Sequence, residues 1–104
     1  MATYDDPKAE HQTLSTTTVD TVKLTQWWDR IEIINKDGTI PLYISQTDSG
    51  VASADPGSDY VAPSSSVILK ARRRPDGVPG NTTTPPHIVY VVGNANAYGV
   101  VGVD

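Results

Sequence analysis

The sequence predicts an all-β fold, a small antiparallel β-sandwich or barrel with an extended N-terminal arm. Short stretches alternate apolar and polar residues with period two, segments rich in Gly, Pro and Asp separate them, and no stretch shows the 3.6-residue period of a helix. Val, Thr, Ile and Tyr, which favour strands, are plentiful. Because 104 residues suffice for one modest core, we expect a single β-domain over residues 19–104, preceded by an arm of residues 1–18.

The arm begins MATYDDPKAEHQ, which is polar, of mixed charge and unable to form a core alone. It continues into TLSTTTVDTV, which is rich in β-forming residues. We therefore expect the arm to be mobile in the free protein. It should become ordered by adding a strand to an exposed sheet edge of a neighbouring subunit.

Seven stretches of the β-domain have strand-like sequences bounded by turn-forming residues. They cover residues 19–24, 27–34, 40–45, 59–63, 64–71, 87–93 and 98–103. The segments QTDSGVASADPGS and RRRPDGVPGNTTTPP are loops, because they consist largely of small, polar, Gly and Pro residues. Short strands with turns between them are typical of a sandwich or barrel.

WWDRIEIIN and IPLYIS flank NKDGT, whose Asp-Gly pair favours a tight turn between antiparallel strands. We expect a hairpin in which Ile33 faces Leu42 and Ile31 faces Ile44. Slipping this register by one residue would mix the inner and outer faces. The predicted core consists of Ile31, Ile33, Leu42, Ile44, Leu69, Tyr90 and Val92.

The closing segment, HIVYVVGNANAYGVVGV, predicts a second hairpin, in which Tyr90 faces Val100 and Val92 faces Tyr98. Its other face is formed by Val89, Val91, Val101 and Val103. A sheet with one face in water should alternate apolar and polar residues, and this one does not. Either both faces are buried within the monomer, or another chain covers one of them. Because 104 residues leave little protein to cover both faces, we expect the second arrangement, which makes these four valines interface candidates.

Two further groups of side chains are interface candidates. The run KARRR holds half of the Lys and Arg residues, with Arg72 and Arg74 expected on one face and Arg73 on the other. The net charge of −4 disfavours nucleic acid as its partner, which leaves a solvated strand end or an electrostatic contact with an acidic protein. Trp27 and Trp28 are strand neighbours and point to opposite faces, so one can join the core while the other anchors a contact.

No arrangement of residues in the sequence points to catalysis or to a cofactor. The Asp-Ser-Gly triplet at Asp48 resembles half of a dimeric aspartic protease site, but it lacks the apolar residues that precede the Asp in those enzymes. The chain has no Cys, and His11 and His87 have no ligand at metal-binding spacing. No stretch approaches the ~20 apolar residues that span a membrane. We expect a protein that is not an enzyme and that binds neither nucleic acid nor a membrane.

The stretch DRIEIINKDGTIPLYISQTDSGVASADPGSDYVAPSSSVIL, with the closing VYVVGNANAYGVVG, resembles a small β-domain of virion proteins of tailed bacteriophages, especially those of actinobacterial hosts. The shared order is an Ile-x-Ile-x-Asn strand, a Gly-containing turn, a Pro-apolar-Tyr-apolar strand and a polar loop. The resemblance covers residues 29–103. It implies a structural virion protein and no catalytic residues.

From this resemblance we expect a capsid decoration protein, made in the host cytoplasm, that binds the major capsid protein on the exterior of the head. Many copies, in contact with one another on the particle, would stabilise the head together. A single domain with an arm and no further domain suits this role. The alternatives are a minor tail or head–tail connector protein, and a carbohydrate- or host-surface-binding module in which exposed Trp27 or Trp28, with Tyr60, forms a stacking platform for the ligand.

Overall fold

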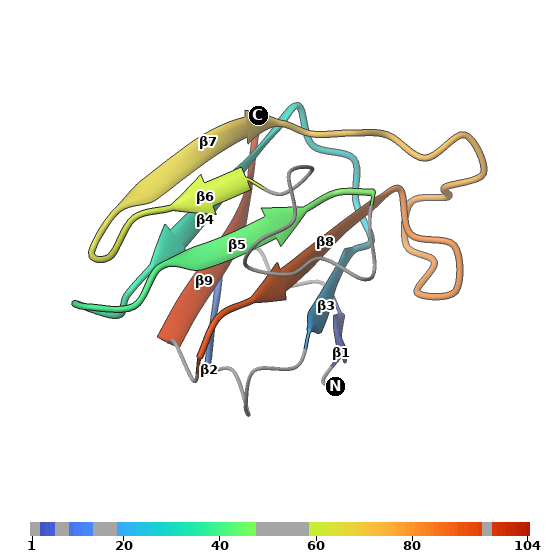
Figure 1. Cartoon of the computed structure of the whole chain (residues 1–104). Coiled ribbons are helices and arrows are strands. Elements are labelled where there is room, and N and C mark those ends of the chain that lie inside the picture. The colour runs from blue at the N-terminus through green and yellow to red at the C-terminus, as the bar shows by residue number, and fades with distance from the viewer. Residues whose placement is uncertain (1–2, 6–8, 14–18, 48–58, 95–96) are drawn as a thin grey trace.

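Two β-sheets face each other across one core (Figure 1). The computed structural model describes residues 3–5, 9–13, 19–47, 59–94 and 97–104, and these residues contain strands and no helix. Sheet A has five strands in the order β1-β3-β8-β5-β6, and sheet B has four in the order β2-β9-β4-β7. All neighbouring strands are antiparallel except β1 and β3. The predicted all-β class is confirmed, with a sandwich as its form.

The strands of the described residues are β1 (Thr3–Asp5), β2 (Ala9–Thr13), β3 (Asp20–Leu24), β4 (Arg30–Asn35), β5 (Leu42–Ser45), β6 (Asp59–Val61), β7 (Ser66–Lys70), β8 (His87–Val92) and β9 (Ala97–Val103). Each of the seven stretches predicted as strands overlaps one of β3 to β9, although β4 begins only at Arg30, so that Trp27 and Trp28 precede the strand. The backbones of β1 and β2 lie at sheet edges, beside β3 and β9 respectively. The rest of the predicted arm lies outside the described residues, so its mobility remains a prediction.

The core is built from the inner faces of both sheets. Ile31 and Ile33 of β4 and Leu42 and Ile44 of β5 are fully buried, as the alternation in their strands predicts. Leu69 is half-buried and packs against this cluster. Burial of apolar surface of this kind is the main favourable contribution to folding.

Strands β4 and β5 do not pair, so the first predicted hairpin is wrong. They lie in different sheets, and residues 36–41 cross between them. Gly38 does not have the positive φ that a tight type I′ turn needs. Instead, the Asp37 carboxylate accepts hydrogen bonds from the backbone N–H groups of Thr39 (2.8 Å) and Ile40 (2.9 Å), which hold the pKa of Asp37 below its usual 3.8. The predicted inner faces are still correct, because strands facing each other across a core bury the same side chains as strands that pair.

Strands β8 and β9 also lie in different sheets, so the second predicted hairpin is wrong as well. The inner face of β8 is formed by Val89 and Val91, which are fully buried, whereas Tyr90 is only half-buried. Val92 is buried too, at 7% exposed. Because β8 pairs with β3 and β5 instead of β9, its inner face is shifted by one residue from the predicted face.

Two buried polar side chains tie the sheets together. The Asn35 amide at the end of β4 donates hydrogen bonds to the carbonyl oxygens of Ile40 (2.9 Å) and Val61 (3.2 Å), and Val61 belongs to sheet A. The Tyr98 hydroxyl of sheet B donates to the Asp20 carboxylate of sheet A at 3.1 Å. Buried hydrogen bonds between the layers fix how one sheet sits on the other.

Candidate functional site

Basic side chains gather at one end of sheet B. Lys70 is the last residue of β7 and Arg30 the first of β4, and the two lie opposite each other in the sheet. Arg72 and Arg73 follow β7 after one intervening residue, Ala71. Although the chain has a net charge of −4, four of its eight Lys and Arg residues lie here. We call Arg30, Lys70, Arg72 and Arg73 the basic end; such segregation of charge favours an anionic partner.

Arg73 makes contacts with an aromatic ring and with a carboxylate. Its guanidinium carbon lies 5.3 Å from the centre of the Trp27 ring, within the range of a cation–π contact. One guanidinium nitrogen is 3.6 Å from a carboxylate oxygen of Asp29. Both side chains of this ion pair are more than half exposed, so the pair adds little stability. Arg73 can therefore exchange Asp29 for another carboxylate at small cost.

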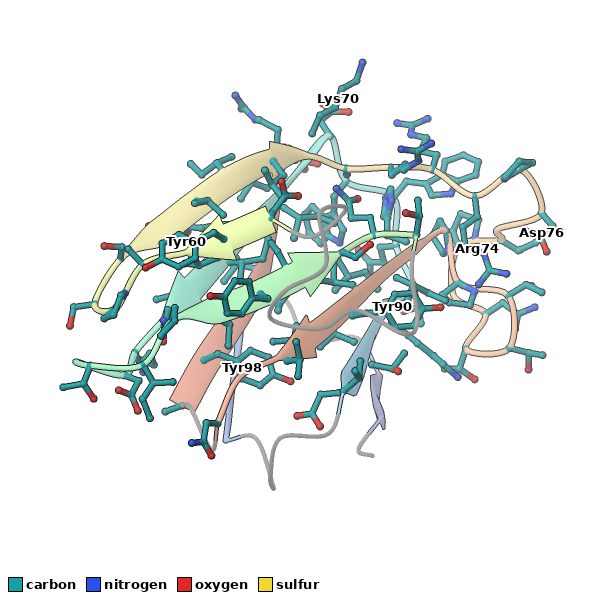
Figure 2. The ribbon with its side chains drawn as sticks, viewed as in Figure 1. Tyr60, Lys70, Arg74, Asp76, Tyr90 and Tyr98 are labelled. Carbon is teal, nitrogen blue, oxygen red and sulfur yellow. The ribbon has the colours of Figure 1, made fainter. Side chains whose placement is uncertain are left out.

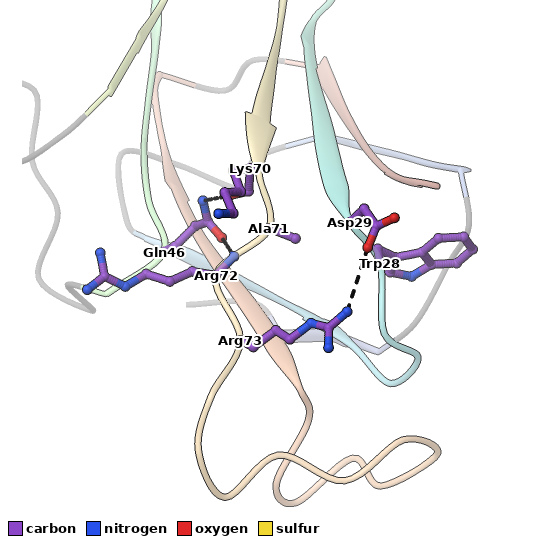
Figure 3. A pocket seen from close by; sticks show the side chains of 7 residues that line it. All are labelled: Trp28, Asp29, Gln46, Lys70, Ala71, Arg72 and Arg73. Atoms are coloured by element: carbon purple, nitrogen blue, oxygen red, sulfur yellow. Dashed lines mark hydrogen bonds and ion pairs between the residues drawn. The ribbon is translucent and has the colours of Figure 1, made fainter.

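A pocket of about 560 Å³ opens at this end of the sandwich (Figure 3). It is lined by Trp28, Asp29, Gln46, Lys70, Ala71, Arg72 and Arg73. Gln46 follows β5 of sheet A and reaches the backbone beyond β7: its Nε2 donates to the Lys70 carbonyl oxygen (3.1 Å), and its Oε1 accepts from the Arg72 N–H (2.7 Å). These two bonds fix the backbone from which the cationic side chains of Lys70 and Arg72 extend.

The buried side chain of His87 links two residues of the pocket. Its Nε2 accepts a hydrogen bond from the Trp28 N–H (2.9 Å), and its Nδ1 donates to the Arg72 carbonyl oxygen (3.0 Å). This pair of bonds requires a neutral imidazole with its proton on Nδ1. Burial is the main cause that lowers the pKa of His87 below its usual 6.5; the Arg72 carbonyl opposes this effect, and the charge of Arg73 adds to it.

Trp28 packs against the core and covers Gly102 of β9. A Cβ at position 102 would lie 2.3 Å from the indole ring, so glycine is required for this contact. The indole Nε1–H is buried and has no hydrogen-bond partner among the described residues. Trp27, in contrast, is 50% exposed. The sequence predicted this division between the two adjacent tryptophans.

The structure brings four of the predicted interface residues together and buries two others in the core. Those that meet at the basic end are Trp27, Trp28, Arg72 and Arg73. Val89 and Val91 are fully buried between the sheets, which corrects their assignment to an outer face. Arg74 is not among the pocket residues; its Nε lies 3.5 Å from a carboxylate oxygen of Asp76 in the loop after β7 (Figure 2).

The outer face of sheet B carries four partly exposed apolar side chains, which we call the outer stripe: Ile34, Ile68, Val101 and Val103. Glu32 lies between Ile68 and Val101 in the register of the sheet, and Arg30 lies between Lys70 and Val103. Ile68 is 59% exposed. The outer stripe and the basic end therefore form one continuous surface.

The sequence did not reveal Gln46 or Arg30 as part of this surface. Gln46 stands in a polar segment after a strand, where nothing in the pattern distinguishes it from its neighbours. Arg30 reaches the basic end only because β4 pairs with β7. A prediction from the sequence that β4 pairs with β7 would have placed Arg30 beside Lys70.

A second exposed aromatic group lies on sheet A. Tyr60 of β6 is 55% exposed, and its ring meets that of Tyr43 edge-on, with 5.6 Å between ring centres and 68° between ring planes (Figure 2). Among the described residues, no ring contact joins Tyr60 to Trp27 or Trp28. The alternative of a carbohydrate-binding platform that uses a tryptophan and Tyr60 stays a prediction.

Within the described residues, no group of three or more His, Cys, Asp or Glu side chains is placed to hold a metal ion. The same part of the chain has no helix long and apolar enough to cross a membrane. Asp48 lies outside the described residues. Comparison of the chain with protein-family models, curated proteins and solved structures finds no match.

Proposed function

We propose that this chain is a binding protein without catalytic activity, and specifically a decoration protein that docks on the exterior of a bacteriophage head. The observation that supports this is the continuous surface of the basic end and the outer stripe. It combines the exposed aliphatic side chains on the outer face of sheet B with an exposed tryptophan and four cations at the end of that sheet. Trp and Arg are enriched at protein–protein interfaces and often dominate their binding energy.

A capsid lattice is the partner that the sequence resemblance favours. The contact surface is a sheet face with a pocket at its end, which suits docking on a broad protein surface. A lattice presents the same site many times, so that a modest contact per copy gives strong retention when neighbouring copies also touch. The backbones of β1 and β2 at sheet edges add a second means of contact, because edge strands pair through main-chain hydrogen bonds.

Trp27→Ala should weaken binding to purified phage heads that lack this protein by about thirtyfold, the loss expected for one aromatic hot spot of ~2 kcal/mol. The matched control is Tyr60→Ala, which removes an equally exposed aromatic ring from sheet A. This control should bind heads as tightly as the unaltered protein. Binding is measured by co-sedimentation with heads, after thermal melts have shown that both variants are folded.

Two results would count against the proposal. If Tyr60→Ala abolished binding and Trp27→Ala did not, the contact surface would lie on sheet A. If the unaltered protein failed to bind heads at all, the decoration role would be rejected.

A further inference from the structure

We infer that the pocket at the basic end is a carboxylate-binding site that receives acidic side chains of a partner protein. The inference rests on the proposed function, because it says which chemical group of the partner the docking surface of this chain would bind. It identifies the pocket as the place where partner and chain meet through charge. The outer stripe and Trp27 supply the apolar part of the same contact.

The charges of the pocket point to an anionic occupant. Its lining contributes the cations of Lys70, Arg72 and Arg73 and the single carboxylate of Asp29, a net charge of +2 on a chain whose total is −4. Within the described residues, Lys70 and Arg72 have no ion-pair partner. Arg30 lies directly opposite Lys70 but is already engaged, because its Nη2 donates a hydrogen bond to the Asp104 main-chain oxygen (3.2 Å). Lys70 and Arg72 are therefore the cations most open to an anionic ligand.

The geometry around Arg73 favours a carboxylate. The guanidinium already faces the carboxylate of Asp29, but at 3.6 Å, which is longer than the ~2.7–2.9 Å of a charge-assisted hydrogen bond. A carboxylate from a partner can take the guanidinium fork with two parallel hydrogen bonds. The cation–π contact with Trp27 restricts the movement of the Arg73 guanidinium in the free protein. The side chain of Arg73 therefore loses less conformational entropy when a carboxylate binds.

The size of the pocket favours a peptide segment over a small ion. At about 560 Å³ it lies within the range of ~300–1,000 Å³ that holds drug-sized ligands. It can therefore accept more than one acidic side chain. The bonds of Gln46 to Lys70 and Arg72 hold the cationic wall in place before any ligand arrives.

Nucleic acid is a poorer occupant. A nucleic-acid site tracks the phosphate backbone with basic residues along its length, on a domain that is basic overall. Here only the four cations of the basic end gather in one place, and the chain as a whole is acidic. An acidic protein segment needs only this local group of cations.

Fluorescence anisotropy with fluorescein-labelled octaglutamate, at low ionic strength, tests the inference. The unaltered protein should bind octaglutamate saturably, more weakly as salt is added, and should not bind octaglutamine. Lys70→Ala and Arg72→Ala should each weaken binding about fivefold. Asp29→Asn should strengthen it about threefold, because the competing carboxylate is gone.

The matched controls remove one positive charge elsewhere. Lys36→Ala acts at the opposite end of β4, and Arg74→Ala acts beside the pocket at a residue that does not line it. Both should bind octaglutamate as the unaltered protein does. If Lys36→Ala weakened binding as much as Arg72→Ala, the interaction would reflect overall charge and the inference would be wrong.

Two further outcomes would overturn the inference. One is equal binding of octaglutamate and octaglutamine. The other is displacement of octaglutamate by inorganic phosphate at a concentration at which acetate has no effect, which would make the pocket a phosphate site. Neither outcome affects the test of Trp27 on heads. Conversely, a protein that binds octaglutamate but not heads would reject only the decoration role.

Discussion

Replacing Ile33 by Ala should lower the free energy of unfolding by about 2–5 kcal/mol, as expected when a large apolar side chain is removed from a tight core. Ile33 is fully buried on the inner face of β4 and belongs to the cluster that joins both sheets. Small domains have a total stability of only about 5–15 kcal/mol, so the loss is a large fraction. Urea denaturation of the variant and the unaltered protein measures it.

The matched control is the next residue along the strand. Ile34→Ala removes the same side chain from the outer face of β4, where it is only partly buried, and should cost about 1 kcal/mol or less. If Ile34→Ala were the more damaging change, the inner and outer faces of β4 would be reversed. The outer stripe would then not be available to a partner.

His87→Phe should destabilise the fold by about 1–3 kcal/mol, even though the new ring is apolar and large enough to fill the site. The variant leaves the Trp28 N–H and the Arg72 carbonyl oxygen without the imidazole that both of them contact. Denaturant melts at neutral pH measure the loss. A variant as stable as the unaltered protein would show that water or a backbone shift replaces both bonds.

The same imidazole should make stability depend on pH. Because the folded protein holds the pKa of His87 below its usual 6.5, the unfolded chain binds more protons between the two values. The stability linked to His87 is therefore fully present above pH 6.5 and is lost as the pH falls from there through the lowered pKa of the folded state. The slope cannot exceed about 1.4 kcal/mol per pH unit for one proton.

Urea melts from about pH 8 down to pH 5, where most carboxylates remain ionised, isolate this effect. The unaltered protein should lose stability over the acidic half of the range, and His87→Phe should lose less. Equal slopes for the two proteins would show that other groups cause the dependence.

The strands could be predicted from the sequence because alternation with period two is a local property. It located β3 to β9 and gave the inner faces of β4 and β5 through Ile31, Ile33, Leu42 and Ile44. The pairing of strands is not local. A connection that crosses between sheets buries the same residues as a hairpin, so alternation could not distinguish the two around Gly38.

The candidate site was only partly visible for the same reason. Trp27, Trp28 and the run from Lys70 to Arg74 stand out in the sequence, but their convergence depends on the pairing of β4 with β7. The assignment of Val89 and Val91 to an interface failed because it depended on a pairing of β8 with β9 that does not exist. No sequence signal distinguishes Gln46, whose role arises from a contact between the two sheets.

The stoichiometry of this chain in purified virions tests the proposed decoration role most directly. If the proposed role is correct, quantitative gel densitometry of phage particles against the major capsid protein measures this ratio. A decoration protein that covers the lattice should be present in a number of copies comparable to that of the major capsid protein. A handful of copies per particle would instead indicate a minor tail or connector protein, and complete absence from virions would contradict a structural role on the particle.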